Sequence, residues 1–330
     1  MPRDAPSIEE VARRSGVSVT TVSHALSGNR PVNEATAARV REVVAELGYV
    51  PATTARNLRT GRTDVIGLIV PDIANTFFSR LARGVEDAAN EVGYSLILCD
   101  ADFDTAREDG YLDLLRSRFI DGLVYVAGSV PGVHRLGTLV SSFPVVLADE
   151  EVAGFPGAGR VSADHLQGGR LAGDHLRELG HREPLVITGP PGLRSSEDRV
   201  RGFREYFPDA VAAAGDFTER GGHQAVRDAL AGGSRFTAVF ALNDLMAIGA
   251  MAALHDAGLD VPGSVSVVGY DDIPLVDRLS PPLTTVRQPG YEVGRVAARQ
   301  LLAKLIDGVP FVETTLPVEL VVRGSTAACP

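Results

Sequence analysis

Apolar positions in the first fifty residues recur with the spacing of short α-helices. Ile8, Val11 and Ala12 fall on one helical stripe, and Val22 and Leu26 fall on another. A glycine separates the two stripes, where the backbone must take a left-handed conformation that glycine adopts cheaply. The pattern predicts two helices folded around a tight turn.

Polar residues mark the starts of these helices. Ser7 and Glu10 form an S-x-x-E capping box at the first helix, and Ser18 is placed to cap the second. Asn33 opens a third helix whose apolar stripe runs to about Leu47. We therefore expect a small three-helix unit that contains a helix-turn-helix.

The second helix presents small and polar side chains near its start. These residues are Val19, Thr20, Thr21, Ser23 and His24. A recognition helix needs this composition, because its first turns enter the major groove and meet base edges and phosphates. Taken alone, the same pattern also fits an ordinary pair of antiparallel helices in a helical domain.

A short segment at residues 51–62 begins with proline and carries glycine near its end, as a short helix would. Its apolar anchors are Ala55 and Leu58, and three arginines accompany them. An isolated helix of two turns is marginal in water. We expect a conditional helix that becomes ordered when it binds a partner.

From Asp64 onward, apolar runs alternate with helical stretches. The first series of runs lies at 65–70, 96–99, 123–126 and 145–147, and a second series after about Ser162 lies at 185–187, 238–242 and 265–268. Continuous apolar strands that alternate with helices predict parallel sheets covered on both faces. Two series predict two α/β lobes with clefts at the carboxyl ends of their strands.

Charge is distributed unevenly between the two regions. The chain has a net charge of −10, yet residues 1–62 hold nine arginines against six carboxylates. A small basic head on an acidic body suits specific docking on DNA by the head alone. The two cysteines, Cys99 and Cys329, offer neither a disulfide framework nor a metal-ligand spacing. Because no leader or membrane-spanning run is present, we expect a soluble cytoplasmic protein with no membrane partner.

The sequence argues against an enzyme. It has no G-x-G-x-x-G or G-x-S-x-G motif, and its single lysine, Lys304, lies outside any P-loop pattern. The seven histidines are scattered, and His165 and His175 each follow an aspartate as surface or capping residues would. We expect no catalytic residues, no metal site and no cofactor.

Residues 7–62 resemble the DNA-binding headpiece and hinge of the LacI/GalR family of bacterial transcription regulators, and residues 64–326 resemble its effector-binding core. The segments that carry the resemblance are 11–12, 16–18, 21–23, 47–51, 55–62, 67–73, 121–122, 180–182, 243–244, 269–272 and 284–289. The core of that family shares its fold with type I periplasmic sugar-binding proteins. The resemblance implies three crossings between lobes, with a helix at 291–307 returning to the first lobe.

The resemblance assigns DNA contacts to eleven residues. They are Ser18, Val19, Thr20, Thr21, Ser23, His24, Asn33, Ala55, Arg56, Leu58 and Arg59. Leu58 matches a minor-groove wedge that unstacks the central base step, and the neighbouring arginines suit phosphate contacts. His24 departs from the family, in which many members carry an arginine at this position. The alternatives are an ordinary linker residue for Leu58 and a phosphate contact alone for His24.

The resemblance also assigns six residues to an effector site. They are Phe77, Asp149, Arg199, Phe217, Asn243 and Asp271. We expect the aspartates at strand ends, Asn243 at a strand-to-helix junction and Arg199 at the start of a helix, all facing a cleft. Asp149 and Asn243 could instead serve as helix caps, and Phe77 could be plain core. Leu193 lies where a purine-responsive member would use arginine, which favours a sugar or sugar phosphate as effector.

These expectations combine into one organisation. They are a helix-turn-helix domain at 1–50, a hinge helix at 51–62 and an effector domain at 63–330, with lobe 1 at about 63–161 and 291–318 and lobe 2 at about 162–290 and 319–330. We predict a ligand-responsive repressor of carbohydrate-use genes that binds a near-palindromic operator as a homodimer. The alternative is a cytoplasmic sugar-binding protein with a vestigial DNA-binding head. The sequence leaves the direction of the effector response open.

Overall fold

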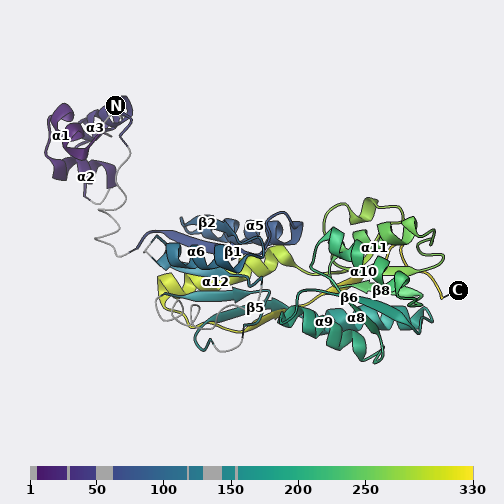
Figure 1. The fold of residues 1–330 in the computed structure, drawn as a ribbon. Helices are drawn as coiled ribbons and strands as arrows, with labels where there is room; N and C mark the ends of the chain where they lie inside the picture. The colour runs from purple at the N-terminus through teal and green to yellow at the C-terminus, as the bar shows by residue number, and fades with distance from the viewer. Residues whose placement is uncertain are drawn as a thin grey trace. The chain divides into compact units, whose positions relative to one another are not determined.

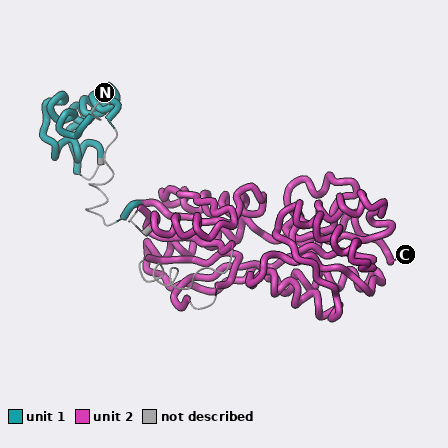
Figure 2. Tube along the Cα trace, viewed as in Figure 1, with its two compact units in different colours: residues 1–63 teal, residues 64–330 magenta. Residues whose placement is uncertain are grey.

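A computed structural model describes residues 6–27, 30–49, 62–116, 119–128, 143–152 and 155–329. The chain divides into two compact units, residues 1–63 and residues 64–330 (Figure 2). The predicted hinge contacts Ala55, Arg56, Leu58 and Arg59 lie outside the described residues.

The first unit contains three helices around a small apolar core. They are α1 (Ile8–Ser15), α2 (Val19–Ser27) and α3 (Glu34–Leu47). The capping box is confirmed at its first half, because the Ser7 hydroxyl accepts a hydrogen bond from the Glu10 amide at 3.3 Å. Gly16 takes the left-handed backbone, with φ of 64°, and ends α1. The sequence therefore encodes this unit through caps and apolar stripes, as predicted.

The second unit consists of two α/β lobes, each built on a six-stranded sheet (Figure 1). The first sheet has the order β11-β5-β4-β3-β1-β2 and the second has the order β12-β10-β9-β8-β6-β7. Neighbouring strands are parallel except for β10 and β12, which pair antiparallel. The predicted class of two parallel-sheet lobes is confirmed.

The strands of the first sheet are β1 (Val65–Val70), β2 (Ser95–Asp100), β3 (Gly122–Tyr125), β4 (Val145–Ala148), β5 (Gly159–Ala163) and β11 (Thr314–Leu316). Those of the second sheet are β6 (Pro184–Thr188), β7 (Val211–Ala214), β8 (Ala238–Ala241), β9 (Ser266–Asp271), β10 (Thr284–Arg287) and β12 (Glu319–Val321). Each predicted apolar run overlaps one of these strands. The sequence analysis missed β5, β7, β10, β11 and β12.

Helices cover the faces of both sheets. Lobe 1 has α5 (Thr76–Glu91), α6 (Thr105–Arg116) and α12 (Gly290–Asp307), whereas lobe 2 has α8 (His165–Glu178), α9 (Arg194–Arg204), α10 (Glu219–Ala231) and α11 (Asp244–Asp256). A 3-10 turn, η1 (Val276–Arg278), follows β9. None of the helices in the described part of the chain is long and apolar enough to cross a membrane.

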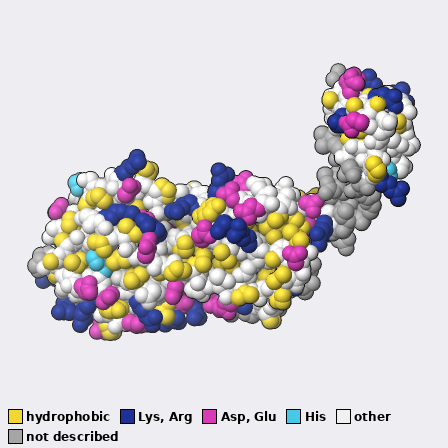
Figure 3. All heavy atoms as spheres, turned by 180° about the vertical axis from the view of Figure 1, so that it is seen from behind, with side chains coloured by type: hydrophobic (Ala, Val, Ile, Leu, Met, Phe, Trp, Pro, Cys, Tyr) yellow, Lys and Arg dark blue, Asp and Glu magenta, His cyan; other side chains and the backbone are white. Residues whose placement is uncertain are grey.

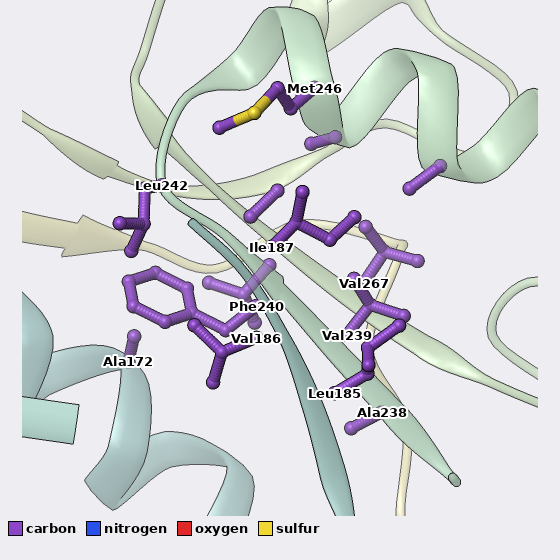
Figure 4. Packing of buried hydrophobic residues seen from close by; sticks show 14 of the residues in the cluster. Ala172, Leu185, Val186, Ile187, Ala238, Val239, Phe240, Leu242, Met246 and Val267 are labelled. Atoms are coloured by element: carbon purple, nitrogen blue, oxygen red, sulfur yellow. The ribbon is translucent and has the colours of Figure 1, made fainter. Parts of the chain in front are cut away.

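Strand β1 shows why its sequence is continuously apolar. Ile66, Leu68 and Val70 pack in a cluster with α5 and α12, while Ile69 packs on the opposite face with residues of α6. A strand buried on both faces loses the alternation of a half-exposed strand. The same arrangement recurs in lobe 2, where Val186, Ile187 and Phe240 lie in a dense core (Figure 4).

The chain crosses between the lobes at three places, after β5, after β10 and after β11. The second crossing returns α12 to lobe 1, where it packs against α5 beside elements from early in the chain (Figure 1). The approach is close enough to require glycine, since a Cβ at Gly84 would lie 2.0 Å from the Tyr291 carbonyl oxygen. The three crossings bring the carboxyl ends of both sheets to one region.

Candidate functional site

The outward face of α2 is accessible in the first unit. Ser18, Val19, Thr20 and Ser23 are exposed, and Thr21 and His24 are half-buried. Val22, on the opposite face of the helix, is completely buried. The helix therefore presents the predicted side chains on a fixed support, and their contact with DNA stays a prediction.

Two of these predicted contacts also serve the fold. The Ser18 hydroxyl accepts a hydrogen bond from the Thr21 amide at 3.1 Å, and the Asn33 side chain accepts one from the Ala35 amide at 3.0 Å. Both residues cap helices, so their side-chain oxygens are already engaged. The amide group of Asn33 and the hydroxyl of exposed Thr20 keep donor capacity for phosphates.

The arginines of the head are divided between internal pairs and free cations. Arg13, Arg14 and Arg41 form exposed ion pairs with glutamates of the same unit. Among the described residues of the head, Arg30 and Arg39 form no ion pair. Unpaired exposed arginines suit phosphate contacts, which determine affinity and register more than sequence choice.

A narrow cavity of about 30 Å³ lies between the two lobes of the second unit. Lobe 1 contributes Pro71, Asn75, Phe77, Phe78, Phe103, Ala127, Asp149 and Glu150, and lobe 2 contributes Leu193, Ser195, Arg199, Phe217, Asn243, Asp271 and Gln288. The structure thus brings all six predicted effector residues to one cavity. Their contact with a ligand stays a prediction.

Arg199 is held rigidly at the back of this cavity. It lies in the middle of α9, so the prediction that it opens a helix was wrong; α9 begins five residues earlier, at Arg194. Its Nη1 donates to the Leu242 carbonyl at 2.6 Å, and its Cζ lies 3.9 Å from the centroid of the Tyr270 ring. A buried guanidinium fixed in this way can offer its remaining N–H groups to a ligand at a defined position.

His165 completes the support of Arg199. The interpretation of His165 as a surface or capping residue was wrong, because its side chain is buried. Its Nε2 donates to the Asp149 carbonyl at 3.0 Å, and its Nδ1 accepts from the Arg199 Nε at 3.4 Å. Burial, together with the charge of Arg199, lowers the pKa of His165 to about 3. The ring is therefore neutral, with its proton on Nε2.

Asp149 and Asp271 bring carboxyl groups into the cavity from strand ends. Both residues have positive φ, 63° and 112°, which turns their side chains away from the direction of the strand. Burial raises the pKa of Asp149 to about 6 against the opposing charge of Arg199, and burial raises the pKa of Asp271 well above its ordinary range. Such shifts at a cleft are typical of ligand sites.

Two buried hydrogen-bond acceptors of the cavity residues have no partner. The Gln288 Nε2 donates to Asp271 Oδ1 at 2.6 Å, which leaves Gln288 Oε1 buried with no partner. Asp149 Oδ1 is likewise buried without a hydrogen bond. Buried polar atoms are normally satisfied, so these two acceptors indicate that a donor-rich molecule belongs in the cavity.

Asn243 is occupied by the protein itself. Its Oδ1 accepts from the Met246 amide and its Nδ2 donates to the Phe217 carbonyl, both at 2.9 Å. The capping alternative for Asn243 thus describes its geometry, and the residue also fixes the position of Phe217. The Phe217 ring lies 6.5 Å from that of Phe103, across the cleft in lobe 1.

Sequence reasoning missed several cavity residues. Gln288 was named only as part of the segment 284–289, and Asn75, whose side chain accepts a hydrogen bond from the Phe77 amide, was not singled out. Glu150 and Ser195 lie in polar stretches whose folding partner is distant in sequence, so no local pattern identifies them. Within the described residues, no group of three histidine, cysteine or acidic side chains could hold a metal ion.

A helix-turn-helix head joined to a two-lobed body with a buried polar cavity defines a class, the ligand-responsive DNA-binding transcription regulators. Comparison with known proteins agrees. Residues 7–52 match the bacterial regulatory proteins of the lacI family, and residues 173–326 match a periplasmic binding protein-like domain. The chain belongs to the LacI family of bacterial regulatory proteins.

Individual relatives cover almost the whole chain. It is 37% identical over 307 residues to the ribose operon repressor of Escherichia coli (strain K12), covering 90% of this chain and 92% of that protein. A LacI family regulator from Enterococcus faecalis V583, solved with bound ribose, is 34% identical with a TM-score of 0.75 over 81% of this chain and 100% of its own. The lac repressor dimer, solved on its operator with an anti-inducer, is 27% identical with a TM-score of 0.86 over 98% and 100%.

Proposed function

We propose that this regulator is a cytoplasmic repressor of sugar-use genes whose effector is a neutral monosaccharide bound in the inter-lobe cavity. The observation that carries the proposal is the pair of buried, unsatisfied acceptors, Asp149 Oδ1 and Gln288 Oε1, beside the fixed Arg199. A sugar has several hydroxyl groups that donate to such acceptors, and each hydroxyl oxygen can accept from the guanidinium.

The charge of the cavity discriminates between a sugar and a sugar phosphate. Asp149, Glu150 and Asp271 line it together with one cation, Arg199. The guanidinium already donates to Leu242 and His165, so little of it remains to neutralise a phosphate. Phosphate sites use backbone amides or several arginines, and a dianion beside Asp149, whose pKa of about 6 leaves it ionised at neutral pH, would be repelled. The cavity therefore supports the sugar over the sugar phosphate.

The lining of the cavity and the relatives favour a small sugar. The aromatic walls of the cavity, Phe77 and Phe217, provide flat apolar surfaces of the kind that pack against a sugar ring. One relative is a ribose operon repressor and another was solved with bound ribose. We therefore take D-ribose as the first candidate.

The regulator is proposed to act as a homodimer through two partly apolar grooves on the second unit. In lobe 1, β2 is an edge strand whose Ile97 and Leu98 are exposed, beside a groove formed with α5. In lobe 2, a groove of about 290 Å³ is lined by apolar residues of α11, such as Met251, and by Leu279. Exposed apolar patches of this kind mark protein interfaces. The lac repressor relative was solved as a dimer.

Operator binding is proposed to use α2 in the major groove and the hinge in the minor groove. A dimer presents two such heads, so the operator would be near-palindromic. The effector would bind the two lobe arrangements with unequal affinity, since otherwise it could not shift the DNA-binding equilibrium.

Calorimetric titration of the full-length protein with D-ribose, ribose 5-phosphate and a purine base tests the effector proposal. We expect saturable binding of D-ribose and no measurable binding of the phosphate ester. Arg199→Leu should abolish binding, whereas the matched change at exposed Arg201 on the same helix should leave it intact. Binding of ribose 5-phosphate in preference to ribose would contradict the proposal.

The alternative function is a sugar-binding protein whose head no longer recognises DNA. The intact caps of α1 and α3 and the exposed face of α2 favour a working head. Retention of specific genomic fragments by the protein distinguishes the two functions, because a vestigial head would retain none.

A further inference from the structure

Helix α9 begins without a cap of its own. Its N-cap residue is Leu193, whose side chain can make no hydrogen bond, although helix starts favour Ser, Thr, Asp or Asn. The first amides of a helix have no intrahelical acceptor and must find one elsewhere. In this helix those amides lie against the cavity and are shielded from water by buried Leu193 and Ser195.

The missing acceptor comes from the opposite lobe. Glu150 follows β4 in lobe 1, and its Oε2 accepts from the Ser195 amide at 3.2 Å. Its Oε1 also accepts from the Ser195 hydroxyl. The Glu150 side chain is buried and lines the cavity. One carboxyl group therefore caps α9 across the cleft, and it can do so only while the two lobes are closed on each other.

We propose that Glu150 is an inter-lobe latch: by capping α9 from lobe 1 it stabilises the closed cleft and thereby raises effector affinity. Glu150 is a positioning residue in this role, because it acts on the closed arrangement of the lobes through Ser195. The consequence for a ligand rests on the proposed function, whereas the latch itself requires no ligand.

The latch should respond to pH. Burial, with the neighbouring charge of Asp149, raises the pKa of Glu150 to about 7. The hydrogen bonds from Ser195 and the charge of Arg199 on α9 oppose this rise, and neutral His165 and buried Asp271 lie beside Arg199. Since an open cleft would return Glu150 to its ordinary pKa near 4.3, the closed form takes up a proton. The closed form is favoured below the ordinary pKa, and this advantage is lost as the pH rises to about 7.

Hydrogen exchange on the full-length, sugar-free protein tests the latch directly. We expect the Ser195 amide to exchange roughly fivefold faster in Glu150→Ala, since loss of a cap has about that effect on a helix start. Exposed Glu151 provides the matched control, and Glu151→Ala should leave the exchange of Ser195 unchanged. Equal exchange in the wild type and in Glu150→Ala would overturn the latch.

Titration with D-ribose tests its effect on binding. At pH 5.5 we expect Glu150→Ala to weaken binding roughly fivefold to tenfold, the range expected when a helix loses its cap. Glu150→Gln keeps both bonds to Ser195 and cannot ionise, so it should bind somewhat more tightly than the wild type at pH 5.5, which lies between the pKa values of the open and closed forms. At pH 8, above both pKa values, the advantage of Glu150→Gln over the wild type should be larger. If Glu150 had a purely structural role, the ratio of the dissociation constants of Glu150→Gln and the wild type would be the same at pH 5.5 and at pH 8.

The outcomes separate the two proposals. If the wild type does not bind D-ribose, the proposed effector is wrong, while hydrogen exchange still decides the latch. If the wild type binds and the ratio between Glu150→Gln and wild type is constant from pH 5.5 to pH 8, the pH-responsive latch is wrong. Ser195→Ala combined with Glu150→Ala should be no weaker than Glu150→Ala alone, because both changes remove one interaction.

Discussion

At the scale of single residues, the cavity brings together carboxyl groups that water does not reach. Asp271 is held by Gln288, and Asp149 lies beside a histidine that is fixed in one tautomer. Each carboxyl would accept hydrogen bonds from a ligand, and each costs free energy while it remains unsatisfied. The site is therefore arranged to favour an occupant that donates hydrogen bonds.

Asp271→Ala tests whether the cavity binds a molecule that donates hydrogen bonds. Asp271 is suited to this test because it is buried, has a positive φ and has a defined partner in Gln288. We expect D-ribose binding to weaken about 10- to 100-fold, as loss of a hydrogen bond to a charged group implies. Binding to operator fragments in the absence of sugar should persist. The matched change at exposed Asp277, in the turn after β9, should leave both unchanged. Normal sugar affinity in Asp271→Ala would remove this residue from the site.

His24 provides a second residue-scale prediction, in the head. Its ring is half-buried at the surface of α2, and a histidine reaches less far than the arginine typical of the family. We expect His24→Arg to change the preferred base at one position of each half-site, in favour of guanine. Sequencing the DNA retained by each variant measures the preference. An unaltered motif would restrict His24 to a backbone contact.

At the scale of elements, the hinge is the segment on which DNA bending should depend. Leu58→Ala should cost a few kcal/mol of specific operator affinity, because the wedge that unstacks the central step is lost. Fluorescence anisotropy with an operator duplex measures that affinity, and a thermal unfolding curve tests whether the fold is intact. Ala55→Ser, on the same short segment, serves as a milder control. Unchanged affinity in a folded Leu58→Ala variant would contradict the wedge.

The strands that the sequence predicts are those that have a clear local pattern of apolar residues. Strand β1 was recognisable because six apolar residues in a row are needed when both faces are buried. Strand β7 was missed because it is a four-residue edge strand of small, largely exposed side chains, and β12 because its pairing partner β10 is distant in sequence. Short edge strands carry little pattern of their own.

The residues of the candidate site also fall into two groups, those that a local sequence pattern identifies and those that it does not. Asp149, Asn243 and Asp271 could be proposed because they follow apolar strands, and the structure brings all three to the cavity. Glu150 and His165 could not, because their roles depend on contacts with α9, which lies 30 or more residues further along the chain. The Glu150 contact is set by the closure of two lobes and the His165 contact by the packing of α8 on α9, and no local spacing encodes either.

At the scale of the whole molecule, the distribution of charge favours DNA binding by the head alone. The remainder of the chain after residue 62 holds 23 basic and 36 acidic residues, which leaves the head as the basic region. On the face that Figure 3 shows, charged side chains of both signs are interspersed with apolar ones over the second unit. Single charged residues there do not suggest a second DNA-binding surface.

Leu98→Glu tests the dimer. A buried charge at position 98 should convert dimer to monomer, which light scattering during gel filtration measures, and should lower operator affinity because paired heads are lost. Val211→Glu, on exposed edge strand β7 of the other sheet, provides the matched control. A dimer that survives Leu98→Glu with full operator affinity would place the interface elsewhere.

The central claim is that one chain reads a specific DNA sequence and a sugar in the same molecule. The most direct measurement is to incubate the full-length protein with fragmented genomic DNA at moderate salt, with and without D-ribose, and to sequence the retained fragments. We predict one near-palindromic motif, beside genes for sugar use, whose retention changes when D-ribose is added. Retention without any shared motif under both conditions would contradict the claim.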